Sequence, residues 1–206
     1  KIGYGTGASF FIEVGAFSGL TLIAGQLGAL ETSAWAVVLN ISAIVFMVPM
    51  GLSSATAVLV GRAYGAKDRT GVIRAGACGL FAVAGIATLI GLVVWPTAPL
   101  LVGAYTREAA LLAVAVPALI LATLFFVADG VQVVAALAVR AAGDVWWPTI
   151  MHIFSYGAVM FPLGYLLSHQ GGLAVDGMVW AVIVASLISA TLLTGRFIRV
   201  ARRLPA

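Results

Sequence analysis

Two carboxylates lie near the middle of long apolar stretches, Glu13 in the first stretch and Asp129 in the fourth. An ionisable side chain at the centre of a hydrophobic span costs on the order of 3 kcal/mol, so such residues usually serve an ion, a proton or a substrate. A hydrogen bond between helices is the other explanation, although a neutral Ser, Thr or Asn would make one at lower cost. Glu13 and Asp129 are therefore the main candidates for a functional site.

Six apolar stretches must position these two acids. Apolar residues make up 63% of the 206 residues and charged residues 9%, which is too little polar surface to cover a water-soluble globule. A spanning helix needs about 20 apolar residues, whereas outer-membrane strands use about 10 alternating ones. We expect an all-α integral membrane protein with six transmembrane helices, near residues 4–28, 34–60, 71–94, 109–138, 148–167 and 177–196.

The basic residues gather on one side of this predicted topology. Of the 11 Lys and Arg residues, only Arg107 falls on the side away from the chain ends. The positive-inside rule then predicts that both termini are cytoplasmic and that the protein is a multi-pass protein of the cell (inner) membrane. The excess of positive charge records this orientation and contact with membrane lipid, and nothing indicates a nucleic-acid partner. Because the chain begins at Lys1 without a signal-peptide pattern, we expect more sequence upstream.

Patterns typical of enzymes and metal centres are missing from the sequence. His152 and His169 lie far apart, with no Cys or carboxylate at ligand spacing, and the single Cys78 cannot form an internal disulfide. There is no nucleophile elbow, phosphate-binding loop or dinucleotide fingerprint. We therefore expect no enzyme activity, no cofactor and no transition metal.

Two connections share a pattern in which Arg-Ala-x-Gly is followed closely by Asp. Glycine permits a tight exit from a helix, and Arg and Asp can stay in water and pair across the turn. A solvated helix end and a hinge both explain this pattern. Its candidate residues are Gly61, Arg62, Gly65 and Asp68 in the first connection, and Arg140, Gly143 and Asp144 in the second. Pro49, Pro117 and Pro162 predict further bends inside the spans.

Several segments taken together resemble a known family. They include 13–18 (EVGAFS), 24–28 (AGQLG), 46–52 (FMVPMGL), 60–66 (VGRAYGA), 129–134 (DGVQVV), 140–144 (RAAGD) and 161–163 (FPL). In this order they resemble the second half of multidrug and toxic compound extrusion (MATE) transporters, with the NorM-like branch as the best match. The resemblance covers essentially the whole chain.

The resemblance implies a twelve-helix antiporter built from two six-helix lobes. Residues 1–206 correspond to its C-terminal lobe, and the N-terminal lobe is absent from this chain. Rocking of the two lobes about a central cavity gives alternating access in such transporters. The missing N-terminal lobe is therefore the expected partner.

The resemblance also implies a cation site. The two acidic residues of the family's site correspond to Glu13 and Asp129 in this chain, and Gln132 follows the aspartate by one turn. Asn40 corresponds to a supporting ligand or to a hydrogen-bond partner of Glu13. Some relatives carry tyrosine where this chain has Phe125 and Phe46, so hydroxyl ligands are missing at these positions.

Two carboxylates without a Lys or Arg in mid-span suit a cation as the coupling ion. Their repulsion favours binding of sodium or of a shared proton, and no metal other than sodium is expected. The resemblance to the NorM-like branch leads us to prefer sodium. Small lipophilic cations are the expected substrates because they compete for the same negative charge. The candidate substrate contacts and supporting residues are Phe10, Phe17, Phe46, Met47 and Phe126, followed by Gln132, His152 and Tyr156.

Two alternative functions remain open at this point. A lipid-linked flippase of the same superfamily should carry several arginines in its cavity to bind phosphate, and this sequence has no Arg or Lys predicted in mid-span. A non-transporting membrane fragment or assembly subunit is the other alternative, because only one lobe is present.

Overall fold

Helices make up nearly all of the protein in the computed structural model, which describes residues 2–203. The described residues contain six spans of 25 to 37 residues that are long and apolar enough to cross a membrane. They are α1 (Ile2–Leu27), α2 (Ala29–Gly65), α3 (Arg69–Gly103), α4 (Ala109–Ala141), a fifth span made of α5 (Trp146–His152), η1 (Ile153–Met160), α6 (Phe161–Tyr165) and η2 (Leu166–Gln170), and α7 (Ala174–Arg202). The prediction of six membrane helices is confirmed.

Most helices are longer than predicted, because the apolar stretch marks only the part of a helix that lies in hydrocarbon. Helix α2 begins at Ala29 instead of residue 34, and α3 continues past two prolines to Gly103 instead of ending near residue 94. Gly28 alone separates α1 from α2, with a φ of 144° that side-chain-bearing residues rarely adopt. A single glycine thus replaces the longer connection that we predicted.

The fifth span departs most from α-helical geometry. Neither Pro49 in α2 nor Pro117 in α4 ends its helix, whereas Pro162 lies in the first turn of α6, between two π-helical segments. The π-helical turns are wider because their hydrogen bonds connect residues five apart. Mixed with α-helical turns, they keep residues spaced by four on one face, and this buried stripe is His152, Tyr156, Met160, Gly164 and Ser168.

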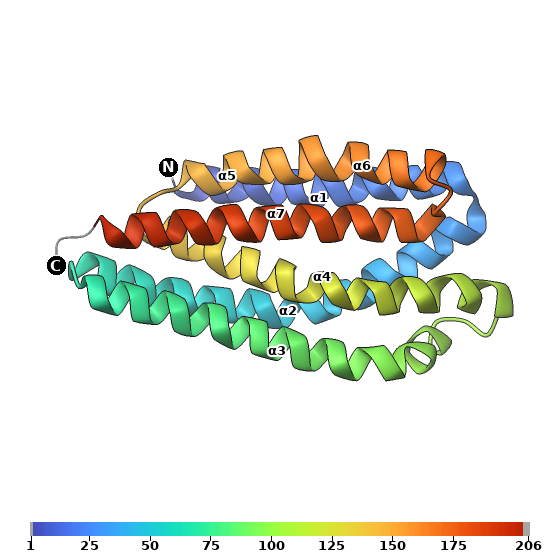
Figure 1. Ribbon diagram of the computed structural model, residues 1–206, viewed down its shortest axis with the longest axis horizontal. Helices are drawn as coiled ribbons and strands as arrows, with labels where there is room; N and C mark the ends of the chain where they lie inside the picture. Colours follow the sequence, from blue (N-terminus) through green and yellow to red (C-terminus); the bar gives the residue numbers. More distant parts are fainter. Residues whose placement is uncertain (1, 204–206) are drawn as a thin grey trace.

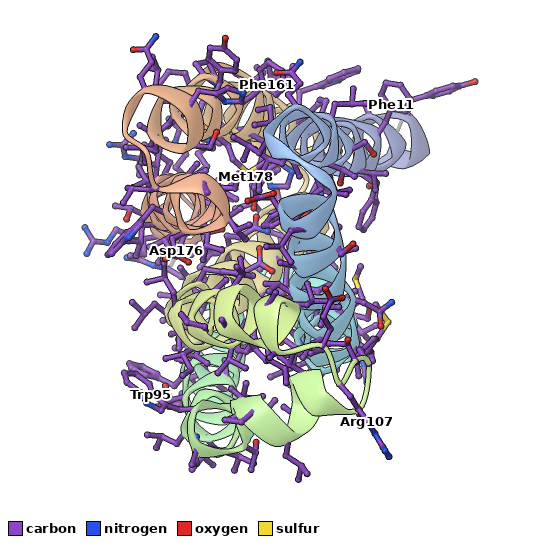
Figure 2. All side chains as sticks on the ribbon, turned by 90° about the vertical axis from the view of Figure 1, so that its right-hand side faces the viewer. Phe11, Trp95, Arg107, Phe161, Asp176 and Met178 are labelled. Atoms are coloured by element: carbon purple, nitrogen blue, oxygen red, sulfur yellow. The ribbon has the colours of Figure 1, made fainter. Side chains whose placement is uncertain are left out.

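Helix α4 forms the centre of the bundle and packs against α2, α3 and α7, while α1 packs mainly against α2 and the fifth span. The spans alternate in direction, so both chain ends lie at the same end of the bundle (Figure 1). Seen along the helix axes, α1 and the fifth span form one edge of the molecule and α3 the other (Figure 2). Helix α4 can therefore present side chains toward several neighbours at once.

The outer surface of the bundle suits lipid. Large apolar side chains project from it, such as Phe11 at 81% exposure and Phe81 at 78%, and Phe11 points away from the bundle in Figure 2. So much exposed apolar surface is unusual for a soluble protein. Together with the six spans, it makes this chain a multi-pass membrane protein.

Candidate functional site

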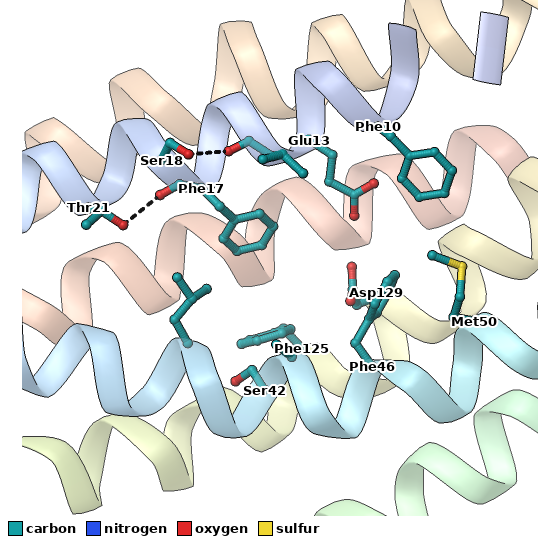
Figure 3. A pocket seen from close by; sticks show the side chains of 13 residues that line it. Phe10, Glu13, Phe17, Ser18, Thr21, Ser42, Phe46, Met50, Phe125 and Asp129 are labelled. Atoms are coloured by element: carbon teal, nitrogen blue, oxygen red, sulfur yellow. Dashed lines mark hydrogen bonds between the residues drawn. The ribbon is translucent and has the colours of Figure 1, made fainter. Parts of the chain in front are cut away.

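Helices α1, α2 and α4 line a partly open cavity of about 400 Å³, called the main cavity below. Side chains spaced by three or four residues on each helix face it, as expected for one face of an α-helix. Figure 3 shows its lining, which is Phe10, Glu13, Val14, Phe17, Ser18 and Thr21 from α1, Leu39, Ser42, Ala43, Phe46 and Met50 from α2, and Phe125 and Asp129 from α4.

Glu13 and Asp129 both face the main cavity, and their carboxylates point toward one another in Figure 3. Their exposed fractions are only 9% and 7%. Helix α1, which carries Glu13, packs mainly against α2 and the fifth span and has little direct contact with α4, which carries Asp129. The two acids therefore face each other across the cavity and not across a direct contact between α1 and α4.

Two buried donors fix the carboxylate of Asp129. Gln132 Nε2 donates to Asp129 Oδ1 at 3.3 Å, and Tyr156 Oη donates to the same oxygen at 3.4 Å. Ser189 Oγ in turn donates to Gln132 Oε1 at 3.4 Å. Among the described residues no donor reaches Asp129 Oδ2, so this oxygen is available to a ligand.

The apolar lining differs in part from the predicted one. Phe10, Phe17 and Phe46 line the main cavity, but Met47 is 60% exposed on the outer face of α2 and its place is taken by Met50, one turn after Phe46. Phe126 is buried in the core, with its ring edge-on to that of Phe125 at 5.2 Å between centroids, and only Phe125 reaches the cavity. Met47 and Phe126 each follow a lining residue, Phe46 and Phe125, by one position, and one position rotates a side chain by about 100° around the helix, so both point away from the cavity.

Asn40 does not reach the two acids. Its neighbour Leu39 lines the main cavity, whereas Asn40 is exposed and its Oδ1 accepts a hydrogen bond of 2.6 Å from Tyr105 Oη. Tyr105 lies just after α3, at the end of the bundle away from the termini. The expected bond between Asn40 and Glu13 is therefore not formed.

Sequence reasoning missed three polar lining residues, of which Ser18 and Thr21 donate to backbone carbonyls of their own helix and Ser42 does not. Ser42 is 7% exposed, and its hydroxyl has no hydrogen-bond partner among the described residues. A buried hydroxyl without a partner is costly, so a ligand oxygen or an ion in the cavity would satisfy it. Its position three residues after Leu39 and four before Phe46, on the face of α2 that lines the cavity, is the signal that could have identified it.

The connections hold a different set of contacts from the predicted one. Arg140 does not lie in water: it is in the last turn of α4, 6% exposed, and its Nη2 donates to Ser9 Oγ. Asp144 pairs instead with Arg196 of α7, at 2.5 Å from Nη2, and Arg196 also lies 4.7 Å from the centroid of the Trp147 ring. The expected pairing of Arg140 with Asp144 is wrong, because the last turn of α4 is buried and Arg140 bonds to Ser9 inside the bundle.

Only one of the predicted helix-ending glycines has the expected conformation. Gly143 has a φ of 86° and leads the chain out of α4. Gly61 and Gly65 lie within α2, and the positive φ of this connection, 56°, falls on Lys67. Asp68 caps α3 by accepting a bond of 2.9 Å from the Gly71 N–H, and Arg62 is exposed.

Comparisons with known proteins agree with this architecture. The sequence model of the MatE family matches residues 6–166. A protein of Caulobacter vibrioides named "Probable multidrug resistance protein NorM" is 51% identical over 197 residues, which are 96% of this chain and 42% of the relative. A protein of the same name from Xanthomonas campestris is 35% identical over 207 residues, 100% of this chain and 45% of the relative.

Solved structures share the fold. The outward-facing conformation of a multidrug resistance MATE family transporter of the MOP superfamily matches 97% of this chain and 45% of that one, with a TM-score of 0.90 at 17% identity. The chain therefore spans less than half the length of the proteins it resembles. The family model covers most of its sequence and the fold agrees, so this chain belongs to the MatE (MATE) family of transporters.

Proposed function

We propose that this chain is the C-terminal six-helix lobe of a cation-coupled antiporter that exports lipophilic, mostly cationic drugs across the inner membrane. The observation that carries the proposal is that two buried acids from separate helices, Glu13 and Asp129, line one largely apolar cavity between α1, α2 and α4. The share of each relative that the chain covers, 42% and 45%, is consistent with one of two lobes. The N-terminal lobe is then its partner.

The distribution of charge supports an orientation with both termini in the cytoplasm. The chain ends and the connections between α2 and α3 and between α4 and α5 share one end of the bundle (Figure 1). Basic residues concentrate there, whereas Arg107 projects from the opposite end in Figure 2. The positive-inside rule assigns the basic end to the cytoplasm.

The main cavity offers oxygen ligands to a small hard cation. Asp129 Oδ2, the carboxylate of Glu13 and the unpaired hydroxyl of Ser42 all belong to side chains of its wall. Sodium takes oxygen ligands, as do calcium and magnesium. Two carboxylates close together in a low dielectric repel one another, and binding of sodium or of a shared proton relieves that repulsion. Sodium is our first choice for the coupling ion.

A lipophilic cation would bind the same wall. Phe10, Phe17 and Phe46 offer ring faces for cation–π contacts, and Met50 adds an adaptable apolar surface. A cavity of about 400 Å³ falls in the range typical of drug-sized ligands. Because ion and drug are attracted by the same two carboxylates, binding of one weakens binding of the other, which is the coupling an antiporter requires.

Drug efflux by the full-length protein in sealed vesicles tests the proposal. A fluorescent lipophilic cation should leave the cytoplasmic side when a sodium or a proton gradient is imposed, each gradient being applied separately. Glu13→Gln should reduce this efflux tenfold or more, and Glu31→Gln, which changes a half-exposed glutamate near the start of α2, should not. Absence of efflux under both gradients would favour a subunit without transport activity, and movement of a lipid-linked phosphate instead of the drug would favour a flippase.

A further inference from the structure

A second, smaller void lies beside the main cavity and holds about 10 Å³, close to the least volume that one water needs. Phe10 and Glu13 line both spaces. The small void is otherwise lined by Ser9, Val133, Ala136, Leu137, Arg140 and His152. Glu13 thus lies between the main cavity, which Asp129 also lines, and a small void that Arg140 also lines.

The guanidinium of Arg140 is held in place beside this void. Its Nη2 donates to Ser9 Oγ, Ser9 Oγ donates to Thr149 Oγ1 at 3.0 Å, and Thr149 Oγ1 donates to the Gly5 carbonyl at 2.9 Å. This chain of bonds joins α4 to α1 and α5. Arg140 Nε and both ring nitrogens of His152 have no partner among the described residues, so the polar groups around the void are incompletely satisfied.

The charge of Arg140 needs a compensating acid, because a buried charge without one is strongly destabilising. Asp144 pairs with Arg196, and Asp129 accepts its bonds from Gln132 and Tyr156 and does not line the small void. Glu13 is the acid that shares the void with Arg140. No direct ion pair joins Glu13 and Arg140 among the described residues, so the two charges interact across this void.

We propose that Arg140 is a tethered counter-cation for Glu13, which competes with the coupling ion and thereby promotes its release. This inference rests on the ion site proposed above. When sodium or a proton neutralises Glu13, Arg140 loses the charge that compensates it, so ion and Arg140 oppose each other through the same carboxylate. Arg140 acts on the ion through Glu13 and is a positioning residue.

The sign of the effect separates this role from a purely structural one. Arg140→Gln removes the competitor, so the ion should bind tenfold or more tightly, while turnover of efflux falls because release is slower. Arg140→Lys keeps the charge and should keep the wild-type ion affinity to within about threefold. Ser9→Ala removes the hydrogen bond to Arg140 and leaves the charge, so it should also keep the affinity. A structural role alone would lower stability in all three variants without tightening the binding.

Titration of the purified full-length protein tests this sign. Sodium chloride is titrated at fixed pH, and protons are titrated without sodium, with the shift in melting temperature as the readout in both arms. Arg196→Gln is the matched control, since it removes an arginine at the same end of the bundle that pairs with Asp144. Unchanged or weaker binding of both ions to Arg140→Gln would overturn the proposal, whereas a wild-type protein that binds neither ion would contradict the proposed function.

A double-mutant cycle tests the pair of charges without any added ion. Glu13→Gln and Arg140→Gln should each lower the melting temperature, and the double variant, which has neither buried charge, should be more stable than the sum of the two losses. If Arg140→Gln alone does not fold, adding Glu13→Gln should restore accumulation of the folded protein. Asp129→Asn combined with Arg140→Gln is the control cycle and should be additive. Additive losses for the pair Glu13 and Arg140, or rescue by Asp129→Asn of the same size, would overturn the proposal.

Discussion

Tyr156 Oη donates to Asp129 Oδ1 at 3.4 Å, which connects the π-helical segment η1 of the fifth span to the central helix α4. The ring of Tyr156 also lies 6.3 Å from that of Phe17 on the wall of the main cavity, and 5.7 Å from that of His152 beside the small void. One buried tyrosine therefore contacts an acid, an apolar lining residue and the histidine of the second void. π-helical turns often occur at functional sites, and this one carries a residue that touches the proposed ion site.

Tyr156→Phe should lower the sodium concentration for half-maximal efflux about fivefold. The hydroxyl stabilises the ion-free carboxylate of Asp129 by about 1 kcal/mol, so without it the carboxylate gains more from binding an ion. Sodium titration of efflux in vesicles measures the change. Tyr165→Phe alters an exposed tyrosine of the same span and serves as the control. An unchanged sodium dependence would show that this hydrogen bond has no part in ion binding.

Asn40→Ala should leave the ion dependence of efflux unchanged. The side chain is exposed and bonded to Tyr105 at 2.6 Å, and it does not line the main cavity. Tyr105→Phe breaks the same bond and should cause an equally small loss of stability, about 1 kcal/mol or less. Sodium titrations of the two variants test this position. A loss of sodium dependence in Asn40→Ala but not in Tyr105→Phe would mean that Asn40 is a ligand in another conformation.

Gly177→Ala should destabilise the protein by about 2 kcal/mol or more, whereas Gly195→Ala in the same helix should be neutral or slightly stabilising. A Cβ on Gly177 would lie 2.7 Å from the backbone carbon of Leu167, and backbone cannot move aside easily. A Cβ on Gly195 would meet nothing within 4 Å. Thermal unfolding in detergent compares the two variants, and equal melting temperatures would contradict the close crossing of α7 and the fifth span.

Arg196→Gln and Asp144→Asn should show a coupling of about 0.5–1 kcal/mol in a double-mutant cycle, and the coupling should shrink at high salt. The pair is partly exposed, with 21% of each side chain accessible, so solvent screens it. Arg196→Lys should recover only part of the stability because it loses the planar contact with Trp147, 4.7 Å from the ring centroid. Melting temperatures at low and high salt measure these terms, and a coupling independent of salt would exclude a simple ion pair.

The sequence predicted the membrane fold and the two acids because both depend on strong local signals. Long apolar stretches specify spanning helices, and a carboxylate inside one is rare enough to indicate function. The turn residues between α2 and α3 were a weaker guide to backbone conformation, because Lys67, and not a glycine, adopts the positive φ in that connection.

The details of the site depend on helix rotation and on long-range packing. The cavity is lined by Met50 and Phe125, whereas we predicted Met47 and Phe126, which lie three positions and one position away along their helices. An apolar helix with little amphipathic character does not define its rotation closely enough to separate such neighbours. Arg140 is followed by Ala-Ala-Gly-Asp, a sequence typical of a solvated helix end. Its burial depends instead on hydrogen bonds with Ser9, and through Ser9 with Thr149, on other helices. Such contacts could not be read from a single sequence.

The central claim is that Glu13 and Asp129 form one ion site, and a double-mutant cycle on ion-coupled efflux tests it most directly. Efflux from vesicles is compared for Glu13→Gln, Asp129→Asn and the double variant, all at equal membrane levels. Each single variant should lose tenfold or more of the sodium-dependent efflux, and the double variant should lose little beyond either, because residues that act as a unit are non-additive. Losses that multiply in the double variant, or sodium-dependent efflux that survives in either single variant, would contradict a shared site.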